Sequence, residues 1–176
     1  MANLRPKVWG KTTVAKFMYG QVFFNLSGDQ SQEDYIKNLD GIIARSSDLT
    51  PALQRVGRYL MGSTLRTFQA EGRPRKWQRL APRTLEDRRK KGFSAGPILD
   101  RTGTLKRSLT QPGAKGSIFI VGPRSLRYGS SILYFETHQK GDPTRNIPKR
   151  AMLVIQRQDR SQISRIMNTH VRGDSE

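Results

Sequence analysis

The spacing of apolar residues predicts three helices. The strongest pattern covers residues 51–70, which Thr50 can cap and Pro51 can open, because proline suits the first helical turn. Residues 32–45 and 159–171 show the same period of three to four residues over shorter stretches. The helix over 51–70 should form the main core element, with one face buried against a sheet. That face consists of Leu53, Val56, Leu60, Thr64, Leu65 and Phe68.

Other stretches favour strands. Residues 14–26 and 117–121 are rich in β-branched and aromatic side chains and are bounded by turn residues. Residues 104–110 alternate loosely, so we expect them to pair with 117–121 in a hairpin. A final strand is expected over 151–155, and a short helix over 131–138. Together these elements predict an α+β fold, which consists of an antiparallel sheet, a long core helix, a basic loop and a C-terminal helix.

The net charge indicates that this domain binds an anionic partner. The 176 residues hold 32 Lys and Arg against 14 Asp and Glu, which gives a net charge of +18. A single domain over residues 1–176 is expected, with 1–30 as an N-terminal strand or extension. Its core should be modest, since only 35% of the residues are apolar. The charge has three usual targets, namely nucleic acid, an anionic membrane surface or an acidic protein.

The most basic segment is residues 72–96, which we interpret as a loop inserted within the domain, with helical capacity only over 84–91. Within it Trp77 could stack on a nucleobase, or it could anchor the loop to the core together with Leu80, and the anchor is favoured. The segment could be a solvated face, a surface facing DNA or a contact for an acidic partner, and the sequence leaves these three open. Its candidate DNA- or partner-facing residues are Arg73, Arg75, Lys76, Arg79, Arg83, Arg88, Arg89, Lys90 and Lys91.

Enzymatic chemistry finds little support. The chain has no cysteine and two histidines, and it lacks the glycine-rich phosphate loops and the metalloprotease and serine hydrolase motifs. Glu136, His138 and Asp142 are close in sequence and could suggest a metal site or a hydrolytic pair. On a helix, however, Glu136 and His138 would diverge by about 200°, so a structural or capping role for His138 is favoured. We therefore expect a non-enzymatic protein without cofactor or metal.

A membrane role is not expected either. The sequence has no run of about 18 apolar residues, and its first 20 residues mix cations with apolar side chains instead of forming a signal peptide. The expectation is a soluble protein, made inside the cell.

Short motifs follow one another through the last two thirds of the chain. They supply the residues Trp77, Leu80, Thr84, Leu99, Thr102, Gly103, Leu105, His138, Gly141, Pro148 and Arg150. In this order they resemble the phage virion morphogenesis family, which contains the tail-completion proteins of Mu-like phages. The resemblance covers about residues 53–171. The motif residues make sense as determinants of the fold, because tryptophan can seat a loop and Thr-Gly permits a tight turn.

The resemblance implies a structural protein of the virion. Such a protein would complete the tail or neck and enable head–tail joining as a homo-oligomeric ring, a hexamer being the favoured number. Its partners would be the tail tube or tail terminator and the head-completion or portal-side proteins, with non-specific contact to genomic double-stranded DNA as a further option. It would be assembled in the host cytoplasm and end at the neck or top of the tail. The alternative is a basic nucleic-acid-binding accessory protein.

Overall fold

The computed structural model describes residues 32–94 and 96–174, so the strand expected over 14–26 lies outside the described residues. The chain divides into two units, Met1–Gly41 and Ile42–Glu176, each considered by itself. The helices are α1 (Gln32–Ser47), α2 (Thr50–Gln69), α3 (Pro82–Lys90), α4 (Thr104–Thr110), α5 (Phe135–Lys140) and α6 (Arg157–Arg172), with a 3-10 turn at Pro143–Arg145. The strands are β1 (Ser117–Gly122) and β2 (Ser125–Ser130). The α+β class is confirmed.

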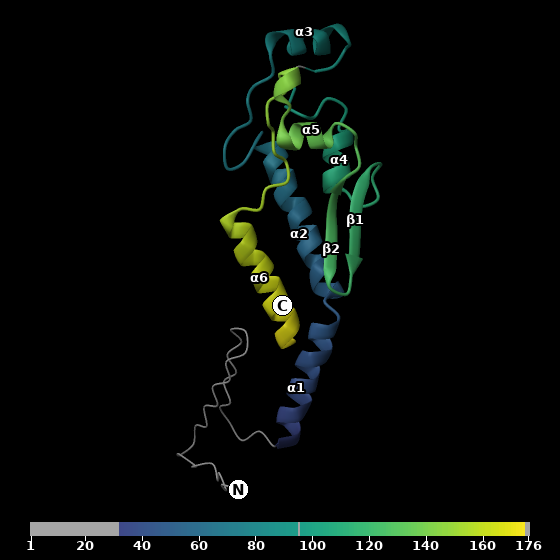
Figure 1. Cartoon of the computed structure of the whole chain (residues 1–176), viewed down its shortest axis with the longest axis vertical. Helices are drawn as coiled ribbons and strands as arrows, with labels where there is room; N and C mark the ends of the chain where they lie inside the picture. Colours follow the sequence, from purple (N-terminus) through teal and green to yellow (C-terminus); the bar gives the residue numbers. More distant parts are fainter. Residues whose placement is uncertain (1–31, 95, 175–176) are drawn as a thin grey trace. The chain divides into compact units, whose positions relative to one another are not determined.

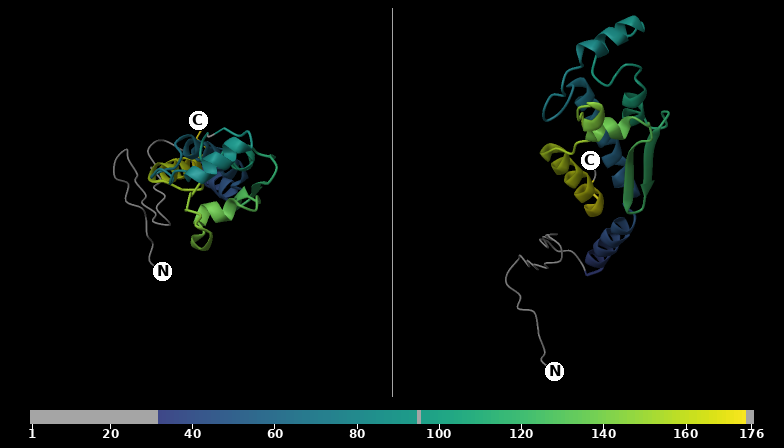
Figure 2. Two further views of the ribbon diagram at one scale, coloured as in Figure 1. Left: turned by 90° about the horizontal axis from the view of Figure 1, so that it is seen from above. Right: turned by 45° about the horizontal axis from the view of Figure 1, so that its top comes forward.

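Helix α2 is the central element of the second unit. It packs against α6, against α4 and against both strands, and α6 and the hairpin lie on different sides of it (Figure 1 and Figure 2). The long helix and the C-terminal helix were both predicted. The start of α2 is capped differently from the prediction, because Thr50 is already the first helical residue and Leu49 occupies the cap position without a side-chain hydrogen bond. The backbone N–H of Thr50 donates to Asp48 Oδ1 (2.9 Å).

The strand expected over 117–121 is present as β1, but the hairpin it forms is not the predicted one. β1 pairs antiparallel with β2, placing Phe119 opposite Tyr128. Residues 104–110 form helix α4 instead of a strand. Strand alternation would put Arg107 on the same face as Leu105 and Leu109, whereas helical spacing buries both leucines and leaves Arg107 exposed. The predicted pairing of 104–110 with 117–121 was therefore wrong.

The expected strand over 151–155 is also absent from the described residues. In this segment the side chain of Gln139 makes the backbone hydrogen bonds that a neighbouring strand would make. Gln139 Oε1 accepts from the backbone N–H groups of Met152 (2.8 Å) and Leu153 (3.1 Å), and its Nε2 donates to Leu153 O (2.9 Å). The short helix expected over 131–138 lies a few residues further on, as α5.

The core consists of two clusters. The first, which we call the Trp77 core, contains Phe68, Trp77, Ile98, Leu105, Leu109 and Met152. Trp77 packs edge-on against Phe68, with ring centroids 5.6 Å apart, and its indole N–H donates to Ala151 O (3.0 Å). Leu80 packs against the same cluster. The predicted anchoring of the basic segment by these two residues is confirmed.

The second cluster, which we call the α2–α6 seam, contains Ala52, Val56 and Ile166. Buried Asp159 joins the two helices across it, since Oδ1 accepts from the hydroxyls of Tyr59 and Ser63, both at 2.9 Å. Its Oδ2 accepts from the backbone of Gln156 in a capping box at the start of α6 (2.9 Å).

The predicted buried face of α2 is only partly correct. Val56, Thr64 and Phe68 are buried, but Leu53, Leu60 and Leu65 are half-buried. The fully covered positions include Ala52, Met61, Ser63 and Thr67 instead, because α2 is enclosed from two sides, by α6 and by the hairpin with α4.

A tyrosine hydroxyl joins three elements. The Tyr128 hydroxyl on β2 donates its one proton to Leu109 O on α4 (2.5 Å), and it lies 2.9 Å from Thr64 Oγ1 on α2, whose hydroxyl can donate to it. Burial raises the pKa of Tyr128 to about 12, although the hydrogen bond to Thr64 opposes that shift.

Candidate functional site: an arginine-lined pocket

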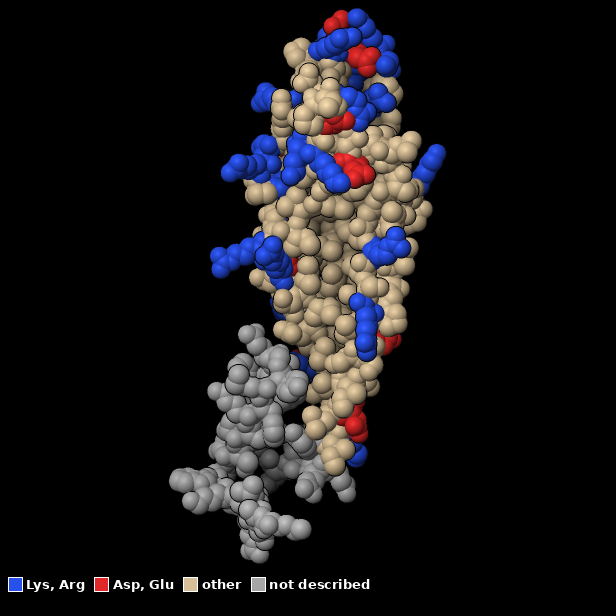
Figure 3. Space-filling view, viewed as in Figure 1, with Lys and Arg blue, Asp and Glu red and all other residues tan. Residues whose placement is uncertain are grey.

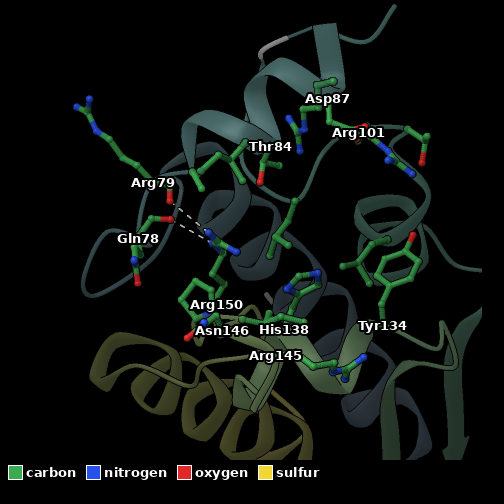
Figure 4. A pocket seen from close by; sticks show the side chains of 18 of the residues that line it. Gln78, Arg79, Thr84, Asp87, Arg101, Tyr134, His138, Arg145, Asn146 and Arg150 are labelled. Carbon is green, nitrogen blue, oxygen red and sulfur yellow. Dashed lines mark hydrogen bonds between the residues drawn. The ribbon is translucent and has the colours of Figure 1, made fainter. Parts of the chain in front are cut away.

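A pocket of about 550 Å³ lies between α3, α4, α5 and the loops that join them (Figure 4). Nine of the eleven motif residues line it, namely Leu80, Thr84, Leu99, Thr102, Gly103, Leu105, His138, Pro148 and Arg150. The two others have structural positions. Trp77 lies in the core, and Gly141 has φ +83° where an added Cβ would come within 2.9 Å of Lys149 N. Residues that are scattered over about 70 positions in the sequence thus converge on one cavity.

The pocket wall at α4 depends on a tight turn. Gly103 has φ +73°, and an added Cβ would collide with Arg107 Nη1. Arg107 Nη2 donates to Thr102 O (3.1 Å), which closes the turn before α4. The expected tight turn at Thr102-Gly103 is therefore present, and it directs the following helix so that Leu105 is buried between the pocket and the core.

Arg150 is the most constrained cation of the pocket. Its side chain is 6% exposed, and it donates from Nε to Gln78 O (3.1 Å) and from Nη2 to Arg79 O (3.4 Å), as Figure 4 shows. Burial, and to a lesser degree Arg88, lower the pKa of Arg150, but a guanidinium remains charged at neutral pH. The protein therefore holds a buried positive charge by backbone carbonyls and not by a carboxylate.

His138 lies beside Arg150 and carries an orphaned polar atom. Its Nδ1 is buried and has no hydrogen-bond partner among the described residues. Burial and then the charge of Arg150 lower the pKa of His138, so the ring is neutral at neutral pH. A neutral imidazole whose Nδ1 carries the proton could donate a hydrogen bond to an anion in the pocket.

The pocket as a whole is cationic. Its lining includes Arg79, Arg88, Arg101, Arg145 and Arg150 against one carboxylate, Asp87. Arg145 is paired with Asp142 (2.6 Å). Arg79 and Arg101 are exposed and have no carboxylate partner among the described residues, and Arg101 lies over the Phe93 ring at 5.0 Å. Such a lining suits an anionic group that enters from solvent.

The nearby carboxylates are already engaged. Glu136 pairs with Lys140 (2.5 Å), one helical turn away. Asp142 accepts from Thr144 and Arg145, and these hydrogen bonds lower the pKa of Asp142 to about 2. In the part of the chain that the structure describes, no group of three or more His, Asp or Glu side chains is placed to hold a metal ion.

The cations of the basic segment fall into two groups. Arg88 is 6% exposed and donates to Gly96 O (3.3 Å) and Pro97 O (3.2 Å), while half-buried Arg73 donates to Ser63 Oγ (3.0 Å). These two arginines support the fold, which removes them from the surface expected to face DNA or a partner. The seven exposed cations are Arg75, Lys76, Arg79, Arg83, Arg89, Lys90 and Lys91. Basic side chains gather over α3 in Figure 3, although Lys90 and Lys91 pair with acidic residues of the same helix.

The chain belongs to the phage virion morphogenesis family, whose model matches residues 31–172. The matched range contains both core clusters and the whole pocket lining. No curated protein and no solved structure gives a significant match. Membership makes this a virion-associated protein with a role in phage structure and assembly. Among the described residues, no helix combines the length and apolar character that crossing a bilayer requires.

The sequence motifs identify most of the residues that line the pocket, but they do not predict that these residues meet in one cavity. The motif residues were interpreted as separate determinants of the fold, and the structure brings most of them together. Sequence reasoning missed Arg101, Tyr134 and Arg145, which line the same pocket. Arg101 lies directly before the Thr102-Gly103 motif, so its position next to a motif was the only available signal.

Proposed function

We propose that this protein completes the phage tail or neck and enables head–tail joining by forming a ring of identical subunits, six copies being the favoured number. The family supports a structural role in assembly. A subunit that repeats one heterologous contact either closes into a ring or continues as a filament, and a tail end requires closure.

The observation that carries the proposal is the exposed apolar face of α1. Ile36 and Ile43 are 55% and 63% exposed, although they are large aliphatic side chains on a 16-residue helix. An isolated helix of that length is marginal in water, because most helical stability in proteins comes from packing an amphipathic face. A second copy of the chain would cover the two side chains that the described residues leave exposed.

Charge favours the same contact. α1 carries three carboxylates against two cations, whereas the protein as a whole has a net charge of +18. Identical subunits of such high charge repel one another, and an acidic helix set against a basic face offsets that repulsion.

The test combines particles and purified protein. We expect the protein in mature particles and a closed oligomer in solution, measured by light scattering and by electron microscopy. Ile43→Glu should shift the oligomer toward monomer, while Asn38→Glu, at an exposed polar position of the same helix, should not. A phage that lacks the protein should accumulate unjoined heads and tails. Absence from virions together with normal joining would contradict the proposal.

A second candidate is a nucleic-acid-binding accessory role. It is favoured by the exposed cations around α3, of which Arg75, Arg79, Arg83 and Arg89 have no carboxylate partner among the described residues. Neutralising several of these cations should flatten the salt dependence of DNA binding, by up to about 0.9 in logarithmic slope for each phosphate that is no longer neutralised. A monomer with this behaviour and no place in the particle would favour the accessory role.

A further inference from the structure

We propose that Asp40 on α1 of one copy enters the arginine-lined pocket of the next copy, while Ile36 and Ile43 cover the apolar residues Leu133 and Tyr134 beside it. The inference rests on the proposed ring, because it names the two surfaces that meet at each subunit boundary. It assigns to the pocket a carboxylate ligand supplied by a second copy of this chain.

The pocket is prepared for a carboxylate before the partner arrives. The buried guanidinium of Arg150 is fixed by Gln78 O and Arg79 O through Nε and Nη2, which leaves Nη1 without a hydrogen-bond partner among the described residues. Figure 4 shows the guanidinium extending into the cavity. Because the side chain is ordered by folding, a ligand that binds it loses little further conformational entropy.

Two more groups of the pocket suit the same ligand. His138 Nδ1 is buried without a partner among the described residues, so a carboxylate oxygen would satisfy an atom that the isolated subunit leaves unpaired. Arg101 is exposed, lines the pocket and has no ion pair within the described part of the chain. One carboxylate has enough lone pairs to accept from several such donors at once.

The donor helix carries the required group between two apolar side chains. Residues 36, 40 and 43 are separated by four and three positions, so Ile36, Asp40 and Ile43 share one face of α1. Asp40 is exposed and makes no ion pair among the described residues. An acidic side chain with an isoleucine one turn before it and another one turn after it thus faces outward.

The acceptor offers the complementary pattern. Leu133 is 97% exposed and Tyr134 is 45% exposed, and Tyr134 also lines the pocket. An acidic group flanked by isoleucines would therefore meet a cationic cavity beside exposed apolar side chains. Close charge pairs that become desolvated in an interface couple strongly, whereas pairs exposed at its rim contribute little.

These observations favour a protein carboxylate over a DNA phosphate. Phosphates lie along the surface of a duplex and are usually bound by exposed side chains that reach outward. Arg150 is only 6% exposed, so only a narrow group that extends from its own backbone can reach it. The exposed Leu133 also has no counterpart in a phosphate backbone.

A charge swap tests the contact directly. The full-length protein is prepared with Arg101→Glu, with Asp40→Arg and with both changes, and the ring-to-monomer equilibrium is measured by sedimentation velocity. Each single change should weaken assembly by roughly tenfold or more, because it places like charges together. The double change should restore part of the affinity, because the two introduced charges can pair although Arg150 still repels the introduced arginine. Arg101 is exposed and makes no hydrogen bond or ion pair within the described part of the fold, so loss of its contact with the Phe93 ring should change the melting temperature little.

Matched controls locate the effect. Asn38→Arg adds positive charge to the opposite face of α1, and Arg160→Glu reverses an exposed charge on α6 outside the pocket. Both should assemble nearly as the wild type does.

Three results would overturn the proposal. If Asp40→Arg assembled as the wild type does, the contact would be rejected. It would also be rejected if the single variants lost assembly and the double variant recovered none of it. Neither result would contradict the proposed ring itself. If Arg101→Glu instead left the ring unchanged and reduced the affinity for a duplex of about 20 base pairs, the pocket would face DNA. A wild-type chain that forms no ring in solution or in particles would reject the proposed function together with this contact.

Discussion

The two core clusters are built by different means. The α2–α6 seam joins two helices whose apolar periodicity is visible in the sequence, and one buried carboxylate connects them. The Trp77 core joins a helix end to loops, with an indole N–H and an amide side chain satisfying backbone groups that no strand partners. The first cluster follows from local pattern, whereas the second depends on particular residues at particular positions. The candidate pocket lies beside the second cluster, where single changes should have the larger effect.

Removal of Trp77 should break the second cluster most severely. Trp77→Ala deletes a buried indole, its edge contact with Phe68 and its hydrogen bond to Ala151 O, and should cost ~3–5 kcal/mol of unfolding free energy. Chemical denaturation measures this directly. Trp77→Phe keeps most of the apolar area and should be much less destabilising. A small effect for Trp77→Ala would show that the basic segment does not depend on this anchor.

A matched pair of leucines compares the two clusters with one chemical change. Leu109 in the Trp77 core is completely covered, and Leu60 beside the seam is half-buried. Leu109→Ala should cost ~3–5 kcal/mol, because a buried cavity remains, and Leu60→Ala should cost ~1–2 kcal/mol, because solvent can fill the space. Thermal unfolding of both variants tests the order. Equal destabilisation would place Leu60 in a core as complete as that around Leu109.

The seam should show a dependence on acid that the Trp77 core lacks. Burial raises the pKa of Asp159, but the hydrogen bonds from Gln156, Tyr59 and Ser63 outweigh it and hold the pKa below its ordinary 3.8. The folded state therefore binds this proton less readily than the unfolded state does. The stabilisation is complete above about pH 4 and is lost as the pH falls through the lower folded value.

Asp159→Asn should accordingly lower stability at neutral pH by ~1–3 kcal/mol, since an amide has one acceptor oxygen and its NH2 group cannot accept the hydrogen bonds that the other carboxylate oxygen takes. The difference from wild type should shrink as the pH falls below about 4. Denaturation curves at neutral pH, at about pH 5 and at about pH 3 measure it. A constant difference across this range would assign the effect to packing alone.

The smallest expected contrast lies between two adjacent arginines of α3. Arg88→Gln removes two contacts to backbone carbonyls at the edge of the Trp77 core and should cost ~1–2 kcal/mol. Arg89→Gln alters an exposed side chain and should leave the melting temperature unchanged within error. If Arg89→Gln proved as destabilising as Arg88→Gln, α3 would owe its stability to charge rather than to this buried contact.

What could be predicted from sequence follows the same division. Apolar periodicity places α2 and α6, and a run of β-branched and aromatic residues places the strand over 117–121, because these signals are local. The choice between helix and strand over 104–110 depended on which face Arg107 could occupy, which only tertiary packing settles. The Gln139 side chain makes the hydrogen bonds to residues 152 and 153 that a neighbouring strand would otherwise make. No local sequence pattern predicts a long-range bond of this kind.

For the candidate site, the order of the motifs indicated the family, but the sequence did not predict that the motif residues form a pocket. Thr84, Leu99 and Arg150 are recognisable one by one, but their meeting in a single pocket depends on the paths of α3, α4 and the loop after α5. The burial of Arg88 could not be separated from the exposure of Arg89, since adjacent cations have the same local signature.

The shared hydroxyl of Tyr128 gives the second unit a built-in optical reporter. A phenol that ionises near pH 12 absorbs as the phenolate only after an ordinary tyrosine has done so, near pH 10. Because the folded protein resists this ionisation, the stability contributed by the neutral phenol should be lost as the pH rises from about 10 toward 12. Burial and Asp159 also raise the pKa of Tyr59 on α2, so a late ultraviolet step that coincides with loss of circular dichroism would report, through these two phenols, the separation of the elements around α2.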